Sequence, residues 1–296
     1  DGMGGARIGA LLDRAASLRA AFAGQDAPPQ PLAGRTVANL FFEPSTRTRT
    51  SFELAARRLG AQVVNFDIAA SSTSKGESLE DTLATLEAMH TDAFVVRHRE
   101  NGTPARLAAS ARRAAILNAG DGNHAHPTQG LLDALTIRDH HADFSRLVVT
   151  ICGDILHSRV ARSDLHMLRA LGAREVRVCG PERLLPAADE RAGAVVTTDF
   201  DAAIEGSDVV IMLRLQKERM TEALVDGESA YFARYGLDAR RLRRAGPGAI
   251  VLHPGPMNRG VEIADDVADG PQSRILAQVA NGIPVRMAVL ATLLQP

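Results

Sequence analysis

The segment from Phe41 to Glu53 carries the densest group of side chains suited to chemistry. It reads Phe-Phe-Glu-Pro-Ser-Thr-Arg-Thr-Arg-Thr-Ser-Phe-Glu and follows an apolar run, Thr36–Phe42, that is typical of a buried strand. Apolar residues at helical spacing then continue to Gly60, which predicts a helix. Helix starts offer free backbone N–H groups and a positive dipole end, so hydroxyl and guanidinium groups there predict a phosphate pocket. Its four residues are Ser45, Thr46, Arg47 and Thr48.

The plainer interpretation of this segment is a serine that caps the helix, beside arginines that face the solvent. The basic run Arg240–Arg244 also has two interpretations. Its arginines could contact nucleic acid, but a solvated helix face is the better interpretation. The net charge of −1 also argues against a nucleic-acid partner.

Bulk properties describe a globular chain with room for two cores. A length of 296 residues suits two domains of ordinary size, and 45% of the residues are hydrophobic. No uninterrupted apolar run approaches the ~20 residues that span a bilayer, so we expect no membrane partner. No signal peptide is recognisable either.

The cysteines and lysines are few and therefore informative. Cys152 and Cys179 each lie in an apolar strand-like run, which favours buried, reduced thiols over a disulfide or a metal site. Reduced thiols fit a cytoplasmic protein. Lys75 and Lys217 are the only lysines among 34 basic residues. Because lysine is a compact charge that can lose its proton, both become candidates for chemistry that arginine cannot perform.

Short apolar runs alternate with helical patterns along the chain. The helical patterns include Leu79–Met89, Thr128–His140 and Ser158–Leu171. The strand-like runs are Val37–Phe42, Gln62–Phe66, Ala93–Val96, Ala115–Asn118, Leu147–Cys152, Glu175–Cys179, Val195–Thr197, Val209–Leu213 and Ala249–Leu252. This alternation predicts an α/β fold with two doubly wound parallel-sheet domains. The helix from Thr128 should lead from the first domain into the second.

Cationic and donor side chains follow several of these runs directly. They are Arg97, His126 with Gln129 in the loop Asn118–Gln129, Arg159, Arg214 and the turn His253-Pro-Gly-Pro. Each alone is explained by a surface ion pair or an ordinary turn. Ligands bind beyond the carboxyl ends of parallel strands, however, and here five motifs occupy that position. Together they predict an active site in an interdomain cleft that holds a pair of anionic ligands.

These motifs resemble the aspartate and ornithine carbamoyltransferases over nearly the whole chain. The matching strings are Ser-Thr-Arg-Thr-Arg at 45–49, Ser-Ser-Thr-Ser-Lys-Gly-Glu at 71–77, His-Pro-Thr-Gln at 126–129, Arg-Leu-Gln-Lys-Glu-Arg at 214–219 and His-Pro-Gly-Pro at 253–256. Ornithine enzymes would be expected to carry Cys-Leu-Pro after the last histidine, where this chain has Pro254. An arginine-lined second pocket would also suit the two carboxylates of aspartate and repel the ammonium of ornithine. The resemblance therefore favours the aspartate branch of the family.

The resemblance implies that the carbamoyl group of carbamoyl phosphate is transferred to the α-amine of L-aspartate. The products would be N-carbamoyl-L-aspartate and phosphate, at an early step of pyrimidine biosynthesis, with no metal and no cofactor. The residues implied to bind the phosphate are Ser45, Thr46, Arg47 and Thr48. Thr48, Arg97 and His126 would meet the carbamoyl oxygen, where negative charge develops.

Further roles follow from the same resemblance. Gln129 and the backbone carbonyls of Pro254 and Gly255 would take the carbamoyl NH2. The aspartate carboxylates would be bound by Arg159, Arg214 and Gln216. Ser71 and Lys75 would reach in from a neighbouring subunit of a homotrimer, where Lys75 is catalytic and also contacts aspartate. A regulatory or dihydroorotase-type partner chain is possible.

The resemblance also implies domain boundaries, and this chain departs from the family pattern at two positions. Residues 1–130 would form the carbamoyl phosphate-binding domain, with a C-terminal helix, 284–296, packed back onto it. Residues 131–283 would form the aspartate-binding domain. Val160 and Thr50 stand where other members often have Thr and Leu, and Val160 removes a possible hydroxyl contact to aspartate. Arg49 is assigned to structure.

Three alternatives remain open at this point. An ornithine or other amino-acid carbamoyltransferase would differ in its acceptor. A metal amidohydrolase is suggested by His124 and His126 after a strand, although that chemistry needs further ligands. A catalytically dead homologue is disfavoured, because the expected active-site residues are intact. A dinucleotide site is excluded, because Gly153 and Gly120-Asp-Gly122 lack the required glycine spacing.

Overall fold

The computed structural model describes residues 2–24, 29–66, 77–187, 191–215 and 227–295. The chain divides into two compact units. Unit 1 contains Asp1–Ile8 and Gln129–Asn281, and unit 2 contains Gly9–Thr128 and Gly282–Pro296. The boundaries fall inside three helices, α1 (Gly5–Ala23), α5 (Pro127–His140) and α11 (Ile275–Leu294), so the chain passes between units within helices.

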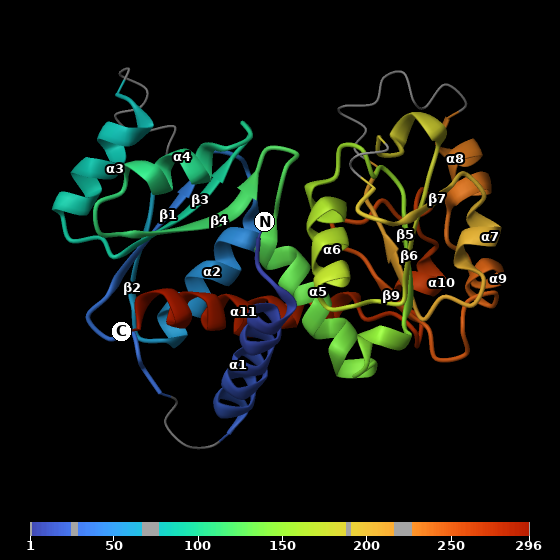
Figure 1. Cartoon of the computed structure of the whole chain (residues 1–296), viewed down its shortest axis with the longest axis horizontal. Helices are drawn as coiled ribbons and strands as arrows, with labels where there is room; N and C mark the ends of the chain where they lie inside the picture. Colours follow the sequence, from blue (N-terminus) through green and yellow to red (C-terminus); the bar gives the residue numbers. More distant parts are fainter. Residues whose placement is uncertain (1, 25–28, 67–76, 188–190, 216–226, 296) are drawn as a thin grey trace. The chain divides into compact units, whose positions relative to one another are not determined.

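Unit 2 is built on a four-stranded, all-parallel sheet in the order β2-β1-β3-β4 (Figure 1). Its strands are β1 (Thr36–Phe41), β2 (Gln62–Asn65), β3 (Ala93–His98) and β4 (Ala115–Asp121). Its own helices are α2 (Thr46–Arg58), α3 (Leu79–Ala88) and α4 (Thr103–Ser110). Helix α2 ends as its sequence predicts, because Gly60 adopts a φ of 87° and donates its N–H to the carbonyl of Arg57.

Alternate residues of the central strands enter two different cores. Val37 of β1 and Val95 of β3 pack with Phe52 of α2 and with apolar residues of α11. Their chain neighbours Ala38 and Phe94 pack on the other face with α3 and α4. Strand residues that alternate between two buried faces are the signature of a sheet covered by helices on both sides.

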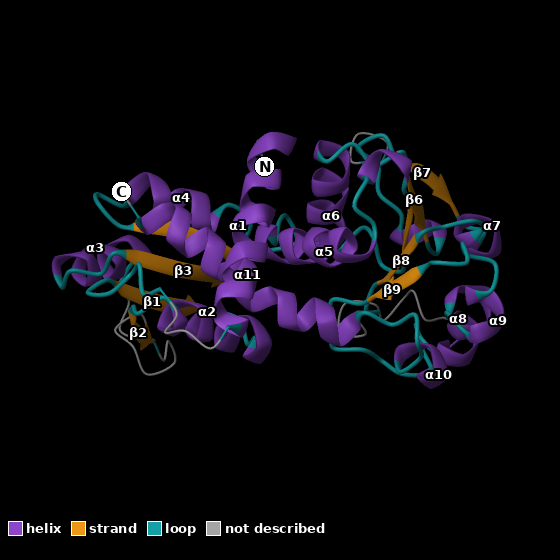
Figure 2. Cartoon of the chain, turned by 90° about the horizontal axis from the view of Figure 1, so that it is seen from below, coloured by secondary structure: helices purple, strands orange, loops and turns teal. Residues whose placement is uncertain are grey.

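Unit 1 contains a five-stranded, all-parallel sheet in the order β7-β6-β5-β8-β9. The strands are β5 (Val148–Cys152), β6 (Glu175–Cys179), β7 (Val195–Thr197), β8 (Val209–Met212) and β9 (Ile250–Leu252). The helices are α5 and α6 (Arg159–Ala170), then α7 (Phe200–Ile204), α8 (Gly227–Tyr235), α9 (Ala239–Leu242) and α10 (Asp265–Ala268). Single 3-10 turns cover Phe144–Arg146 and Glu182–Leu184. Figure 2 shows the helical and strand layers from below.

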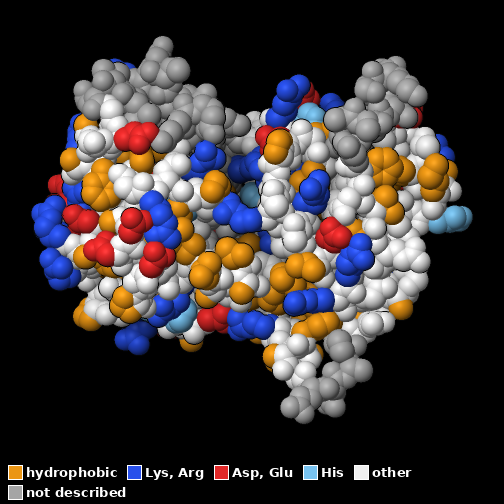
Figure 3. All heavy atoms as spheres, turned by 180° about the vertical axis from the view of Figure 1, so that it is seen from behind, with side chains coloured by type: hydrophobic (Ala, Val, Ile, Leu, Met, Phe, Trp, Pro, Cys, Tyr) orange, Lys and Arg blue, Asp and Glu red, His pale blue; other side chains and the backbone are white. Residues whose placement is uncertain are grey.

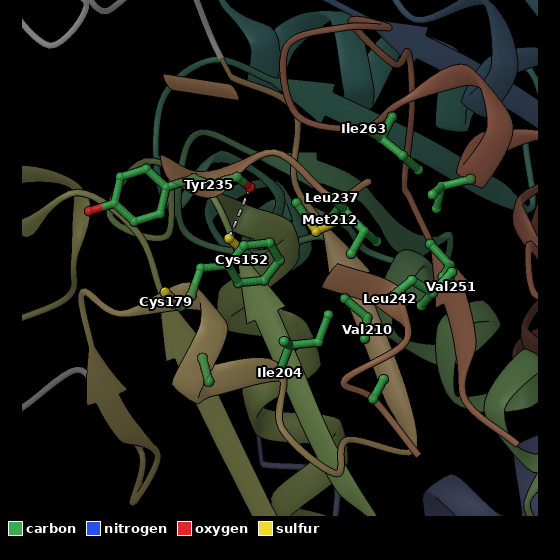
Figure 4. Close-up of a cluster of buried hydrophobic side chains, with 14 of the residues drawn as sticks. Cys152, Cys179, Ile204, Val210, Met212, Tyr235, Leu237, Leu242, Val251 and Ile263 are labelled. Carbon is green, nitrogen blue, oxygen red and sulfur yellow. Dashed lines mark hydrogen bonds between the residues drawn. The ribbon is translucent and has the colours of Figure 1, made fainter. Parts of the chain in front are cut away.

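One large core of unit 1 lies between its sheet and helices α7 to α10. Figure 4 shows Met212 and Val251 from neighbouring strands pointing into it beside Ile204 and Leu237. Cys152 and Cys179, which pair in register on β5 and β6, are free and fully buried there, as predicted. The Cys152 Sγ lies 3.8 Å from the carbonyl oxygen of Tyr235. Burial, and secondarily Cys179, raise the pKa of the Cys152 thiol, so it is no nucleophile at neutral pH.

Helix α11 contributes to both units. Gln278 and Asn281 donate to Asp133 and Thr136 of α5, while Met287 and Leu290 enter the core of unit 2. The Arg286 guanidinium lies 5.0 Å from the centroid of the Phe52 ring. Among the described residues this helix alone is long and apolar enough to span a membrane by length and composition, and 61% of that window is buried inside the structure.

The predicted α/β class with two parallel sheets is confirmed, and every predicted strand is present. Two predictions about local structure are wrong. The loop placed at Asn118–Gln129 is shorter, because β4 continues to Asp121, whose N–H donates to the carbonyl of Ala125. Arg241 is not part of a solvated face. It is 7% exposed, and its guanidinium donates to the carbonyl oxygens of Phe232, Ala233 and Gly236.

Charges of both signs are mixed on the surface of unit 1. On the face of this unit turned to the viewer in Figure 3, basic and acidic side chains are interspersed. Two of the ion pairs join Arg259 to Asp265 and Asp269 at 2.8 and 2.7 Å. The hydrogen bond from Arg259 holds the pKa of Asp269 below its usual value.

Candidate active site

The predicted phosphate loop joins β1 to the start of α2 in unit 2. Ser45 is the N-cap residue of α2, with an extended φ of −160°, and Thr46 is its first helical residue. The Ser45 hydroxyl makes no capping hydrogen bond to α2, so the plain capping interpretation does not account for this serine. Thr48 is 8% exposed, whereas Arg47 lies on the exposed side of the first turn. The loop therefore combines helix N–H groups, hydroxyls and an arginine, the donors that a phosphate dianion needs.

Arg97 lies on the neighbouring strand, β3, and pairs in register with Phe41 at the end of β1. The register between β3 and β4 shifts between Val96 and His98, so Arg97 occupies an irregular point of the ladder. Such irregularities re-aim a side chain. The Arg97 Nη1 donates to the carbonyl of Ala119 at 3.2 Å, and its Nε lies 3.3 Å from Oε2 of Glu43.

Glu43 is a site residue that the sequence analysis missed. It lies in the β1–α2 loop, two residues before Ser45, and its side chain is 16% exposed. Its position in the sequence could have indicated this role, because an acidic residue next to a predicted cationic pocket needs a nearby cationic partner. The ion pair links the phosphate loop to Arg97 on the adjacent strand.

His126 and Gln129 come from the next strand exit, between β4 and α5. His126 is 5% exposed and directly precedes Pro127, the first residue of α5. Gln129 is half-buried on the first turn of α5, where its Nε2 donates to Oδ1 of Asp133 at 3.0 Å. The sequence analysis did not mention Asp133, although its spacing of four residues from Gln129 on a helix placed the two on one face.

The motifs of unit 2 cluster at the topological switch point of its sheet. The chain proceeds from β1 outward to β2 and then returns to β3 on the other side of β1. The crevice beyond the carboxyl ends of β1 and β3 is where open parallel sheets bind ligands. The phosphate loop follows β1, Arg97 is the penultimate residue of β3, and His126 follows the adjacent β4.

The motifs of unit 1 occupy the equivalent place. Its switch point lies between β5 and β8, since the chain proceeds from β5 to β6 and β7 and returns at β8. Arg159 is the first residue of α6 after β5, and Arg214 lies two residues beyond β8. The N–H of Leu213 donates to the carbonyl of Cys152 at 2.8 Å, which extends the pairing of β5 and β8 to the residue before Arg214.

The turn His253-Pro-Gly-Pro follows β9, next to β8. The buried His253 accepts the N–H of Gly255 at Nδ1, at 2.8 Å, and its Nε2 faces Oε1 of Glu262 at 3.2 Å. Pro254 and Pro256 have no N–H, and the peptide bond between Gly255 and Pro256 is cis. The turn therefore presents carbonyl oxygens, as the predicted binding of an NH2 group requires.

Other predicted site residues cannot be placed. Ser71, Lys75 and Gln216 lie outside the described residues, as does Lys217. Val160, the second residue of α6, is half-buried and brings no hydroxyl to the start of that helix. Within the described ranges no group of three or more His, Cys, Asp or Glu side chains is arranged to hold a metal ion, so His124 and His126 find no further ligands there.

Comparison with known proteins identifies the chain. The model of the carbamoyl-P binding domain of aspartate/ornithine carbamoyltransferases matches residues 2–139, and that of the Asp/Orn binding domain matches residues 145–293. The chain belongs to the aspartate/ornithine carbamoyltransferase family. It is 60% identical over 296 residues to the aspartate carbamoyltransferase catalytic subunit of Xanthomonas campestris pv. campestris, which covers 99% of this chain and 94% of that protein.

Solved structures of the family share the fold. Aspartate transcarbamoylase from Trypanosoma cruzi, in complex with N-(phosphonacetyl)-L-aspartic acid, has a TM-score of 0.87 at 34% identity, covering 98% of this chain and 92% of that one. Ornithine carbamoyltransferase from Thermus thermophilus has a TM-score of 0.87 at 29% identity, covering 99% and 96%. The two sheets of this chain thus correspond to the carbamoyl phosphate and amino-acid domains of the family.

Proposed function

We infer that this chain catalyses carbamoyl transfer from carbamoyl phosphate to L-aspartate, the activity named for its 60% identical relatives. The observation that carries the inference is the pair of cationic motifs at the switch points of the two sheets. One holds hydroxyls and an arginine at a helix start, and the other holds two arginines. The first suits a phosphate dianion and the second suits a dicarboxylate.

In the proposed site, the phosphate of carbamoyl phosphate is held by the loop of unit 2. Its ligands are Ser45, Thr46, Arg47 and Thr48. The carbamoyl oxygen faces Thr48, Arg97 and His126, which come from the exits of three adjacent strands. Donors set in place before reaction are effective because they stabilise the charge that develops on this oxygen.

Aspartate and the carbamoyl NH2 are assigned to groups of unit 1. Arg159 and Arg214 bind the aspartate carboxylates, with Gln216 as a further ligand. The carbonyls of Pro254 and Gly255, together with Gln129, accept from the NH2. Because one pair of substrates must contact both the residues of unit 2 and those of unit 1, the proposed active site is an interdomain site. Residues 1–130 and 131–283 then act as carbamoyl phosphate and aspartate domains.

The reaction balances without an added base. The aspartate α-amine attacks the carbamoyl carbon, a C–N bond forms, and the C–O bond to phosphate breaks. The departing phosphate accepts the proton that the amine loses. Holding both substrates in attack geometry lowers the activation barrier by several kcal/mol.

Assembly forms the remaining part of the proposal. Ser71 and Lys75 complete the site of a neighbouring subunit in a homotrimer, in which Lys75 adds a compact charge near both substrates. We also propose a partner chain of a regulatory or dihydroorotase type, and the name catalytic subunit in relatives supports a partner without specifying its kind. The two reduced, buried cysteines fit a cytoplasmic location.

An acceptor panel tests this function. The purified chain is given carbamoyl phosphate with L-aspartate, L-ornithine or L-asparagine at equal concentration, and released phosphate is measured with and without a metal chelator. Only L-aspartate should support turnover, and the chelator should leave it unchanged. Turnover with ornithine instead would assign the chain to the other branch, and loss with the chelator would favour the amidohydrolase alternative.

A further inference from the structure

A buried carboxylate on α5 joins two glutamines of unit 1. Asp133 is 1% exposed, and its Oδ1 accepts from Nε2 of Gln129 at 3.0 Å and from Nε2 of Gln278 at 2.5 Å. Gln278 lies on α11 and is 1% exposed. Neither the proposed reaction nor the predicted site residues account for this carboxylate.

The chemistry of a carboxylate fixes how both glutamine amides are turned. An ionised carboxylate only accepts hydrogen bonds, so each glutamine must present its NH2 group to Asp133. The carbonyl oxygen of each side chain is then left for another donor. In Gln278 that oxygen, Oε1, accepts the backbone N–H of His253 at 3.0 Å. In Gln129 the same constraint leaves Oε1 as an acceptor for a ligand.

The second branch of this network ends in the turn after β9. Gln278 fixes the N–H of His253, and Nδ1 of His253 in turn fixes the N–H of Gly255. Since Pro254 and Pro256 carry no N–H, the backbone from residue 253 to 256 keeps only carbonyl oxygens for a ligand. Asp133 thereby connects to both parts of the receptor proposed for the carbamoyl NH2.

We propose that Asp133 is a positioning residue that makes this receptor accept hydrogen bonds only, and so selects a carbamoyl group over an acyl group without NH2. The inference rests on the proposed function, because it concerns the donor substrate of that reaction. A methyl group in place of NH2 donates nothing to Gln129, Pro254 or Gly255. Their oriented oxygens would be left unsatisfied, which is how a polar site rejects an apolar analogue.

A second carboxylate next to Asp133 supports its charged state. Asp164 of α6 is 2% exposed, and the two residues line one narrow crevice between α5, α6 and β8. Burial, followed by the charge and hydrogen bond of Asp133, raises the pKa of Asp164 far above its usual value. Asp164 therefore stays protonated at neutral pH, and the two glutamine NH2 groups that donate to Asp133 mark Asp133 as the acceptor of the pair.

The test uses two inhibitors that differ only at the selected position. Phosphonoacetamide carries the NH2 of carbamoyl phosphate, and acetonylphosphonate carries a methyl group there. Inhibition constants of both, competitive with carbamoyl phosphate, are measured for the wild type, Asp133→Leu, Asp133→Asn and Gln278→Met. For each protein, the ratio of the two inhibition constants cancels any effect on binding of the phosphonate group or on the amount of folded protein.

The wild type should prefer the amide, and Asp133→Leu and Gln278→Met should lower that preference roughly five- to tenfold, the loss of about one neutral hydrogen bond. Asp133→Asn keeps an acceptor oxygen and should retain most of the preference. Thr136→Val is the matched control, because the Thr136 hydroxyl accepts a hydrogen bond from Asn281 across the same two helices and donates its own to the carbonyl of Leu132. It should lower the melting temperature and leave the ratio unchanged.

Each of the following results would overturn the proposal. An unchanged ratio in folded Asp133→Leu contradicts it, and so does an unchanged ratio in Gln278→Met, which remains available if the buried Leu variant does not fold. A wild type that transfers carbamoyl groups but shows no preference for the amide would also contradict this inference alone. A wild type that binds neither phosphonate would overturn the proposed function together with it.

Discussion

Arg97 and Glu43 form an ion pair across two neighbouring strands, with Nε of Arg97 3.3 Å from Oε2 of Glu43. Both side chains are largely buried, at 13% and 16% exposure. Because Glu43 belongs to the loop that carries Ser45 and Thr46, the pair ties the oxyanion donor to the phosphate loop. A partly buried pair of this kind holds its arginine more firmly than a solvated one.

Glu43→Gln should therefore impair catalysis through Arg97. We expect kcat/KM for carbamoyl phosphate to fall about tenfold, because the substitution removes the negative charge that holds a largely buried arginine in place. In an Arg97→Ala background, Glu43→Gln should change kcat/KM less than twofold, because the guanidinium that pairs with Glu43 is already absent. Steady-state kinetics of the four proteins in this cycle check the coupling. Equal effects of Glu43→Gln in both backgrounds would show that Glu43 acts independently of Arg97.

Arg47→Ala and Arg214→Ala should fail in different ways. The first removes a cation from the phosphate loop and should raise the KM for carbamoyl phosphate at least about tenfold. The second removes a carboxylate ligand and should raise mainly the KM for aspartate. Measuring both substrate dependences for both variants tests the assignment. If each variant affected the two substrates alike, the division into two pockets would be wrong.

Asp164→Asn should change how stability depends on pH. The folded pKa of Asp164 is raised, so above about pH 4 the native state keeps a proton that the unfolded state releases. Stability of the wild type is therefore lost as pH rises from there toward the folded pKa, by up to ~1.4 kcal/mol per pH unit. Asparagine does not titrate, so the free energy of unfolding of the variant should rise relative to that of the wild type as the pH increases from 5 to 8.

Calorimetry at equal chain concentration measures this difference. Asp269→Asn provides the control, because the hydrogen bond from Arg259 lowers the pKa of Asp269 and leaves it ionised in both states over this range. Its stability should run parallel to that of the wild type. Parallel curves for Asp164→Asn as well would mean that Asp164 is ionised in the native state.

Mixing inactive chains tests the shared site. Lys75→Ala and Arg97→Ala are dissociated, combined and reassembled. If Lys75 serves a neighbouring subunit, about one site in four should receive its main part from one parent and its loop from the other, so activity should recover to roughly a quarter of wild type. No recovery despite demonstrated subunit exchange would indicate that each chain builds its own site.

Local patterns predicted most of the architecture. Apolar runs located the nine strands of the described residues, and Gly60 located the end of α2. The same runs placed Arg97 near the carboxyl end of β3, although the strand continues to His98, and placed Arg159 after β5, where it begins α6. These features depend on residues close together in the chain, which is why one sequence suffices for them.

Contacts between distant elements were not predictable in the same way. The pairing of Glu43 with Arg97 depends on the order of β1 and β3 in the sheet, and that of Asp133 with Gln278 depends on where α11 packs. Arg241 was misassigned for a related reason. Its basic neighbours indicate a solvated face, yet α9 is only four residues long, and the guanidinium satisfies carbonyls at the end of α8.

The most direct test of the central claim follows the new C–N bond. The purified chain is incubated with [13C]carbamoyl phosphate and [15N]-L-aspartate, and the product is examined by NMR. Transfer to the α-amine predicts N-carbamoyl-L-aspartate whose carbamoyl carbon shows one-bond coupling to the labelled nitrogen. Labelled carbon found only in bicarbonate or free carbamate, with unmodified aspartate, would contradict the account.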